Sequence, residues 1–268
     1  MHAQHSVADA VSFVRNIPLT PQTFGPGKSL LAPRAVGFNP ATEQNQSVVV
    51  GSEVQVFAHG VEQNLRRAMM HSALIAQLAA TARVPQQNSR EDFAAWYEVY
   101  FATLNNLGWV LADHRLGDYE GVGSVSEVHQ AVLALAAGLL GGTASLAYRL
   151  VAASIEALRD YKGDAPWFTI FNRQVQRKRV AAFQVSAAEL DSLHGGLSVA
   201  LMAYQISSQR DFTQVLLFKF AHEHLSFEQW TSHVAIEESF LMETDPAIYK
   251  RIREYIPGYI AQLELPPI

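Results

Sequence analysis

The spacing of apolar residues divides the chain into a helical part and a strand-rich part. Between residues 60 and 161, apolar side chains recur every three or four positions, which is the period of an amphipathic helix. After residue 180 the alternation is closer to every second residue, and short turn-forming segments separate the apolar runs. Consecutive strands with short links form antiparallel meanders. The pattern predicts an α+β protein, helical in its first two-thirds and with an antiparallel β-meander in its last third.

Helices are predicted at 60–83, 89–107, 124–140, 143–161 and 244–256. Ser89 with Asp92, and Ser124 with Glu127, have the three-residue spacing of an N-terminal capping box. Pro246 follows Asp245, as a proline at the first turn of a helix follows its cap.

Strands are predicted at 48–57, 180–190, 197–207, 212–221 and 227–241, with a short hairpin at 109–119. Within the segment 197–207 both alternating sets are apolar, because Leu197 and Leu201 alternate with Met202 and Tyr204. A strand that is apolar on both faces is typical of a sheet covered on both sides. We therefore expect helices on both faces of the sheet.

Residues 1–47 are predicted to form an irregular arm, and residues 48–268 a single α+β domain. Between residues 17 and 47, prolines and glycines interrupt regular structure, among them Pro18, Pro21, Gly25, Pro26, Gly27, Pro33 and Pro40. No internal repeat divides the remainder, whose length is common for one domain.

The composition excludes several classes of function. The chain is 49% apolar and 17% charged, carries a net charge of −5 and has no cysteine. An acidic balance argues against nucleic-acid binding. The lack of cysteine excludes disulfides, thiolate zinc sites, iron–sulfur clusters and a thiol nucleophile. Low charge also leaves little to cover the surface, so either the protein buries more of its chain than usual or part of its surface meets a partner. We expect such a partner to be another protein or a second copy of the chain.

The N-terminal residues do not have the pattern of a secretory signal. No basic segment is followed by a long apolar core. The sequence predicts cytoplasmic synthesis without a signal peptide, and export by a non-classical route stays open.

Three short segments resemble soluble bacterial proteins of unassigned activity. They are Ser72–Ala80, Asn106–Val110, and Ala247–Tyr249 with Arg251 or Arg253 after it. The helix-plus-meander layout is similar to that of small bacterial virulence factors, the Erwinia virulence factor among them. The resemblance implies a bacterial source and no catalytic residues, and the lipidated cysteine of that factor has no counterpart here.

Residues 128–148 form an uncharged stretch rich in alanine, glycine and leucine. A membrane span needs about 20 apolar residues. His129, Gln130 and the pair Gly141-Gly142 interrupt this one, as they would in a helix pair packed inside a soluble domain. Two interpretations stay open: an ordinary core element, or a helix pair at 128–159 that is exposed conditionally at a membrane.

A second segment places basic residues beside aromatic ones. The candidate contacts with an anionic membrane or another anion are Trp167, Phe168, Phe171, Arg173, Arg177, Lys178 and Arg179. The alternative is a solvated run whose charges balance nearby acids.

Histidines suggest one candidate metal site. His222 and His224 point to the same side of an extended chain, and His233 and Glu237 on the next predicted strand could complete a nitrogen–oxygen site. The alternative is a solvated turn. No nucleophile elbow and no complete phosphate loop are present.

These observations leave three hypotheses for function. The first is a non-enzymatic bacterial interaction or virulence-type factor, able to self-associate and with no cofactor. The second is a membrane-active, toxin-like protein that uses residues 128–159. The third is a metal-dependent enzyme that uses His222, His224 and His233.

Overall fold

The computed structural model describes most of the chain between residues 6 and 265. The described residues are 6–21, 45–87, 89–111, 115–118, 127–177, 179–191, 196–209, 211–212, 214–217, 226–263 and 265. The predicted arm falls largely on residues 22–44, outside this set.

A mixed sheet forms the centre of the molecule. Its strands are β1 (Gln46–Val50), β2 (Glu53–Phe57), β3 (Val110–Leu111), β4 (Arg115–Asp118), β5 (Gln176–Arg177), β6 (Val180–Asp191), β7 (Gly196–Ser207), β8 (Ser226–Glu237) and β9 (Ile260–Leu263). Their order is β3-β8-β7-β6-β2-β1-β9, with β4 also on β8 and β5 also on β6. The long strands β6, β7 and β8 pair antiparallel, whereas β2 runs parallel to β6. The sheet therefore joins the predicted C-terminal meander to an N-terminal hairpin.

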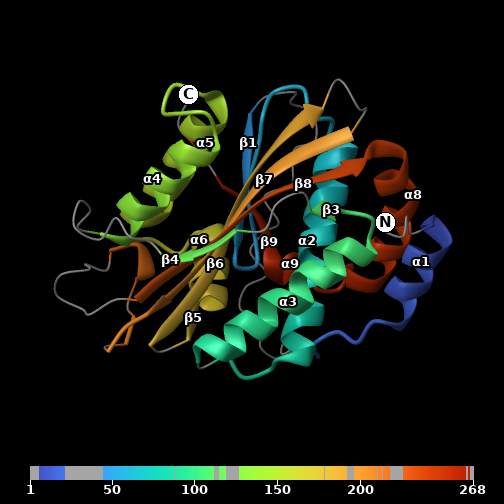
Figure 1. Ribbon diagram of the computed structural model, residues 1–268, viewed down its shortest axis with the longest axis horizontal. Helices are drawn as coiled ribbons and strands as arrows, with labels where there is room; N and C mark the ends of the chain where they lie inside the picture. The colour runs from blue at the N-terminus through green and yellow to red at the C-terminus, as the bar shows by residue number, and fades with distance from the viewer. Residues whose placement is uncertain are drawn as a thin grey trace.

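Helices cover both faces of this sheet (Figure 1). They are α1 (Val7–Asn16), α2 (Gln63–Arg83), α3 (Arg90–Asn106), α4 (Val128–Leu139), α5 (Leu146–Asp160), α6 (Pro166–Val175), α8 (Glu238–Ile252) and α9 (Ile256–Tyr259), with a short 3-10 turn η2 (Val215–Leu217). One layer contains α1, α2, α3 and α8, and the other contains α4, α5 and α6.

Alternation along the strands divides the interior into two cores. On β7, Leu197, Val199 and Leu201 join the core beneath α2 and α3. Met202 and Tyr204 of the same strand join the core beneath α4, α5 and α6. Because successive side chains of a strand point to opposite faces, one apolar strand serves both cores. The predicted α+β class and the sheet covered on both faces are confirmed.

Four details of the prediction are wrong, and each has a local cause. The segment 48–57 is two strands rather than one, because Gly51 adopts a φ of 58° and turns the chain back. The segment 109–119 is no hairpin in its described residues, because β3 and β4 each pair with β8. The last long helix begins at Glu238, directly after β8, and Pro246 lies inside it.

The fourth wrong detail is the predicted strand 212–221. Its described residues form η2, whose Val215 and Leu216 are buried against the helices rather than paired with the sheet. The Gln214 side chain donates to the carbonyl oxygens of Leu158 and Arg159, both at 2.9 Å. These bonds satisfy carbonyls at the end of α5 that lack helical partners, so the segment ends a helix instead of extending the sheet.

Candidate functional site

The uncharged stretch 128–148 forms α4, the corner after it and the first turn of α5. Glu127 and Gln130 make a capping box at the start of α4. Gly141 and Gly142, with φ of 78° and 94°, end the helix in a conformation that favours glycine. Ser145 then caps α5 by accepting a hydrogen bond from the Tyr148 backbone nitrogen at 3.1 Å. Local chemistry therefore builds a tight helical hairpin, which we call the α4–α5 tip (residues 130–148).

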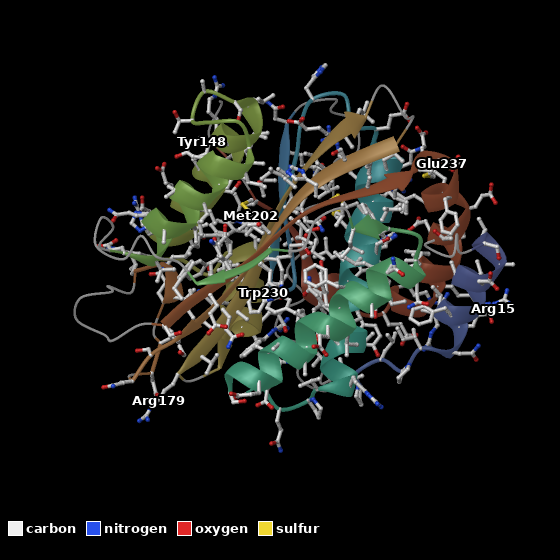
Figure 2. All side chains as sticks on the ribbon, viewed as in Figure 1. Arg15, Tyr148, Arg179, Met202, Trp230 and Glu237 are labelled. Atoms are coloured by element: carbon white, nitrogen blue, oxygen red, sulfur yellow. The ribbon has the colours of Figure 1, made fainter. Side chains whose placement is uncertain are left out.

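Much of the α4–α5 tip is accessible to solvent and none of it is charged. Its exposed positions are Gln130, Ala134, Gly138, Gly141, Thr143 and Ala144. Leu133, Leu139, Leu140, Leu146 and Tyr148 are half-buried and pack at the margin of the core beneath them. Tyr148 lies far from Arg15 and Glu237 at the other side of the molecule (Figure 2). A charge-free surface bordered by half-buried leucines is a candidate contact site.

The two helices also touch through a buried histidine. Arg159 of α5 donates from Nη1 to Nε2 of His129 on α4 at 3.0 Å. The Nδ1 of the same ring lies 3.2 Å from a carboxylate oxygen of Glu127. His129 is 5% exposed. The contact fixes the N-terminus of α4 to the C-terminus of α5, at the end of the hairpin opposite its corner.

Apolar packing holds α4 and α5 on the sheet. Val132, Val151 and Ile155 are fully buried in the core that they share with the sheet. Among the described residues, we find one side-chain hydrogen bond from this pair to the sheet, between the hydroxyls of Ser154 and Ser47 at 2.5 Å. No helix in the described part of the chain has the length and apolarity to cross a bilayer.

The described members of the predicted basic–aromatic set do not lie together on one exposed surface. Trp167 and Phe171 are buried beneath α6, and Phe168 packs against the same core. Arg173 donates to the carbonyl oxygen of Gly258 and lies 5.7 Å from the Tyr259 ring centre.

Arg179 is exposed and lies 3.5 Å from Asp211, an exposed partner. In Figure 2 it lies at the lower left of the molecule, well below Tyr148. The Arg177 side chain and Lys178 lie outside the described residues. Of the other predicted contact residues, Arg179 is exposed, and Phe168 and Arg173 are half-buried.

The predicted histidine site is only partly described. His222 and His224 lie outside the described residues, and His233 is exposed on β8 opposite Ala200 of β7. Within the ranges that the structure describes, no three potential metal ligands come together.

A buried carboxyl network lies on the other face of the sheet and was not predicted. Glu53 of β2 accepts hydrogen bonds from Ser186 at 2.6 Å, Gln55 at 3.0 Å and Tyr100 at 3.0 Å. Burial raises the pKa of Glu53, and these three bonds oppose the rise. The adjoining cavity has a volume of about 20 Å³, enough for about one water. Such a space has no room for a substrate, so the network stabilises the interface of α2 and α3 with the sheet.

Alternation within β2 was the sequence signal for this network. Glu53 and Gln55 are polar positions in a strand whose neighbours Val54 and Val56 are apolar. That pattern normally indicates a solvated face. In the structure α2 and α3 cover this face, and the polar residues bond to one another and to Tyr100.

No family model and no curated protein matches the chain. Several solved structures show a weak likeness to it, among them the following two. One is titled delta-endotoxin, with a TM-score of 0.36 and 8% identity over 70% of this chain and 84% of that one. The other is activated Cyt2Ba monomer from Bacillus thuringiensis subsp. israelensis, with a TM-score of 0.39 and 10% identity over 68% of this chain and 96% of that one. Likeness at this level assigns neither a family nor an activity.

Proposed function

We propose that this protein is a membrane-binding, toxin-like factor that contacts lipid bilayers through the α4–α5 tip. The observation that supports the proposal is the charge-free surface of residues 130–148, which ends at the exposed Arg149. Transfer of this surface into the interfacial region of a bilayer buries leucines and small residues and desolvates no charge. Apolar area then contributes about 25 cal/mol for each Å² removed from water.

The length of α4 limits the depth of this contact. Twelve residues correspond to about 18 Å of helix at 1.5 Å per residue. The hydrocarbon core of a bilayer is about 30 Å thick. The tip therefore lies in the interfacial region, as amphipathic membrane-surface helices do, rather than crossing the membrane.

A bilayer suits this surface better than a protein partner for a chemical reason. The exposed positions are mostly alanine and glycine, and the leucines beside them are half-buried. Protein interfaces concentrate their binding energy in aromatic and arginine anchors, and within the tip Tyr148 alone is of that kind. A fluid hydrocarbon phase needs no such anchors, since any apolar area that it covers contributes.

Vesicle flotation and dye release at neutral and mildly acidic pH test the proposal. We expect the wild-type protein to float with vesicles of phosphatidylcholine and phosphatidylglycerol and to release an entrapped dye. Ala134→Asp combined with Gly138→Asp places two carboxylates on the outer face of α4. A side chain at Gly138 meets no atom within 4 Å, so the variant should fold. We expect it to bind at least about tenfold more weakly, since tenfold corresponds to 1.4 kcal/mol.

Val110→Asp is the matched control. Val110 is 60% exposed on β3, in the part of the sheet away from the tip, and its change should leave flotation and release unaltered. Failure of the wild type to bind at either pH would overturn the proposal. If sedimentation instead shows a dimer that the paired Asp variant disrupts, the tip is a self-association surface and the first of the three hypotheses replaces this one.

A further inference from the structure

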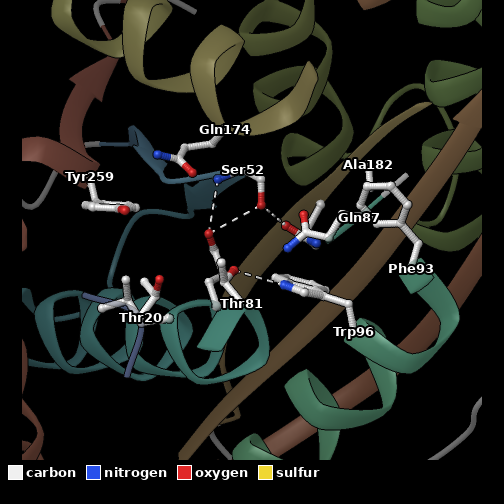
Figure 3. A pocket seen from close by; sticks show the side chains of 12 residues that line it. Thr20, Ser52, Thr81, Gln87, Phe93, Trp96, Gln174, Ala182 and Tyr259 are labelled. Carbon is white, nitrogen blue, oxygen red and sulfur yellow. Dashed lines mark hydrogen bonds between the residues drawn. The ribbon is translucent and has the colours of Figure 1, made fainter. Parts of the chain in front are cut away.

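A small pocket lies where the β1–β2 hairpin meets the helices that flank it (Figure 3). Distant segments build it: the β1–β2 turn, α2, α3, α6, β6 and α9. Four glutamines line it, namely Gln77, Gln87, Gln174 and Gln184, together with the rings of Trp96 and Tyr259. Its volume is about 30 Å³, which corresponds to about two waters.

The inner wall of this glutamine pocket is held rigid by hydrogen bonds. Ser52 donates from its backbone nitrogen to the Gln77 Oε1 at 3.1 Å and from its hydroxyl to the Gln184 Oε1 at 2.9 Å. The Gln77 amide donates in turn to the Val50 carbonyl at 2.9 Å. Gly51 belongs to the same wall, because a Cβ there would lie 2.2 Å from the Gln77 Oε1. A wall fixed in this way is preorganised and loses little entropy on binding.

The outer wall contains hydrogen-bond donors and acceptors that are not used within the described part of the chain. Within the described part of the chain, the Gln174 side chain and the Thr20 hydroxyl make no hydrogen bond. The Thr81 hydroxyl accepts from the Trp96 indole nitrogen at 3.1 Å, which leaves its own proton free to donate. The Gln87 amide donates to the Val84 carbonyl at 3.3 Å, so its oxygen is free to accept. Donors and acceptors therefore face the pocket together.

The charge of the lining restricts the ligand. None of the described residues that line the pocket is an acid or a base. An ion in such a site would lose its hydration without gaining a counter-charge, which is costly. A neutral group with both hydroxyl donors and acceptors matches the amides and hydroxyls, and its CH faces match the aromatic rings.

We propose that the glutamine pocket binds a neutral sugar unit, with one hydroxymethyl or paired-hydroxyl end inside and the rest of the ring at the mouth. The small volume admits two oxygen-bearing groups rather than a whole pyranose. Tyr259 is half-exposed at the pocket, where its ring can cover the outer part of the sugar. The site is remote in the fold from the α4–α5 tip, and the inference does not depend on the bilayer proposal.

Saturation-transfer NMR and tryptophan fluorescence of the full chain test this inference. The probes are methyl glucoside, methyl galactoside and N-acetylglucosamine, with gluconate and glucosamine as charged analogues. We expect at least one neutral sugar to saturate in the millimolar range and both charged analogues to bind more weakly. Gln174→Ala and Thr20→Val should each weaken binding about threefold to tenfold, the range of one lost hydrogen bond, without changing the melting temperature.

Thr169→Val is the matched control, because Thr169 is exposed on α6 and does not line the pocket. It should bind as the wild type does. The inference is overturned if no neutral sugar saturates, which would make this a water-filled pocket. It is also overturned if Gln174→Ala and Thr20→Val bind as well as Thr169→Val.

Discussion

Glu53 places an acidic side chain where water does not reach, and its hydrogen bonds come from neutral donors. The side chain is 1% exposed. Ser186, Gln55 and Tyr100 can all donate to a carboxylate, yet none carries a compensating positive charge. Desolvation is the largest influence on this group and raises its pKa. The folded protein therefore holds the Glu53 proton more tightly than the unfolded chain does.

This difference predicts that stability falls as the pH rises above the ordinary pKa of a glutamate, and that Glu53→Gln removes this loss. Below the ordinary pKa of a glutamate both states keep the proton, and the folded state has its full stability. As the pH rises from there through the raised pKa, the folded state must place a charge in the core and stability falls. The neutral amide of the variant would resemble the protonated acid at every pH, so the advantage of the variant in free energy of unfolding should grow as pH rises.

Urea unfolding across the pH range measures that advantage. Glu98→Gln provides the control, because Glu98 is exposed on α3 and the same change of charge there takes place at the surface rather than in the core. If the difference in free energy of unfolding between Glu53→Gln and the wild type varies with pH no more than that for Glu98→Gln, Glu53 is not the group responsible.

Residue-level sequence reasoning reached some of these features and missed others. The capping box at Ser89 was predicted from spacing alone, and Ser89 does accept from the Asp92 nitrogen at 3.2 Å while Asp92 accepts in return at 3.1 Å. A cap depends on neighbours three residues apart, which a sequence displays. The Glu53 network joins residues 53, 100 and 186, and such a distant combination has no local signature. The glutamine pocket is similarly invisible, because its four amides come from separate elements.

At the scale of elements, the end of α3 depends on one glycine. Gly108 has a φ of 91°, and its backbone nitrogen donates to the Asn105 carbonyl while that of Trp109 donates to Leu104. These bonds close the helix and direct the chain into β3. A Cβ at this position would lie 2.3 Å from the Phe240 ring of α8. The glycine therefore allows both the left-handed turn and the close approach of α8.

Gly108→Ala should destabilise the protein, and Gly138→Ala should not. The left-handed conformation costs about 1–2 kcal/mol for a residue with a Cβ, and displacement of the Phe240 ring adds to it. Gly138 lies within α4 with open space around it, where alanine gains about 1 kcal/mol in helix propensity. In thermal unfolding, the melting temperatures of the two variants should thus shift in opposite directions from that of the wild type. Equal shifts in melting temperature would mean that neither the left-handed φ of Gly108 nor the close approach of Phe240 constrains the turn after α3.

Element prediction succeeded where one pattern sufficed and failed where two elements competed for the same residues. The helical spacing of apolar residues in α2 and the apolar residues on both faces of β7 were sufficient signals. Both elements lie where they were expected. The run 212–221 has the composition of a strand, yet Gln214 bonds to the end of α5 and its neighbours pack against helices. The sequence could not show that the end of α5 required those bonds. The same holds for the parallel pairing of β2 with β6, which links residues far apart.

Across the whole molecule, the two helical layers are attached to the sheet by different forces. The α2–α3 layer bonds to it through side chains: Tyr100 to Glu53, Tyr97 to the Tyr204 carbonyl at 3.2 Å, and Gln77 to Val50. In the described residues, α4 and α5 rely on apolar packing and the Ser154–Ser47 contact. Lipid hydrocarbon can replace apolar contacts, but it offers nothing in place of a hydrogen bond. If the tip binds lipid as proposed, the α4–α5 side is therefore the one that we expect a bilayer to loosen.

Hydrogen exchange with and without anionic vesicles should show this asymmetry. On vesicle binding we expect altered exchange in residues 130–160 and unchanged protection of α2, because the loosened layer opens locally and the rest stays folded. The Ala134→Asp and Gly138→Asp double variant should show no altered exchange in residues 130–160. Exchange that rises throughout both layers would instead indicate global unfolding at the membrane, and the different attachment of the two layers would then have no role in binding. A change in hydrogen exchange confined to α4 and α5 would show that the charge-free stretch 128–148 belongs to the helical layer that lipid loosens.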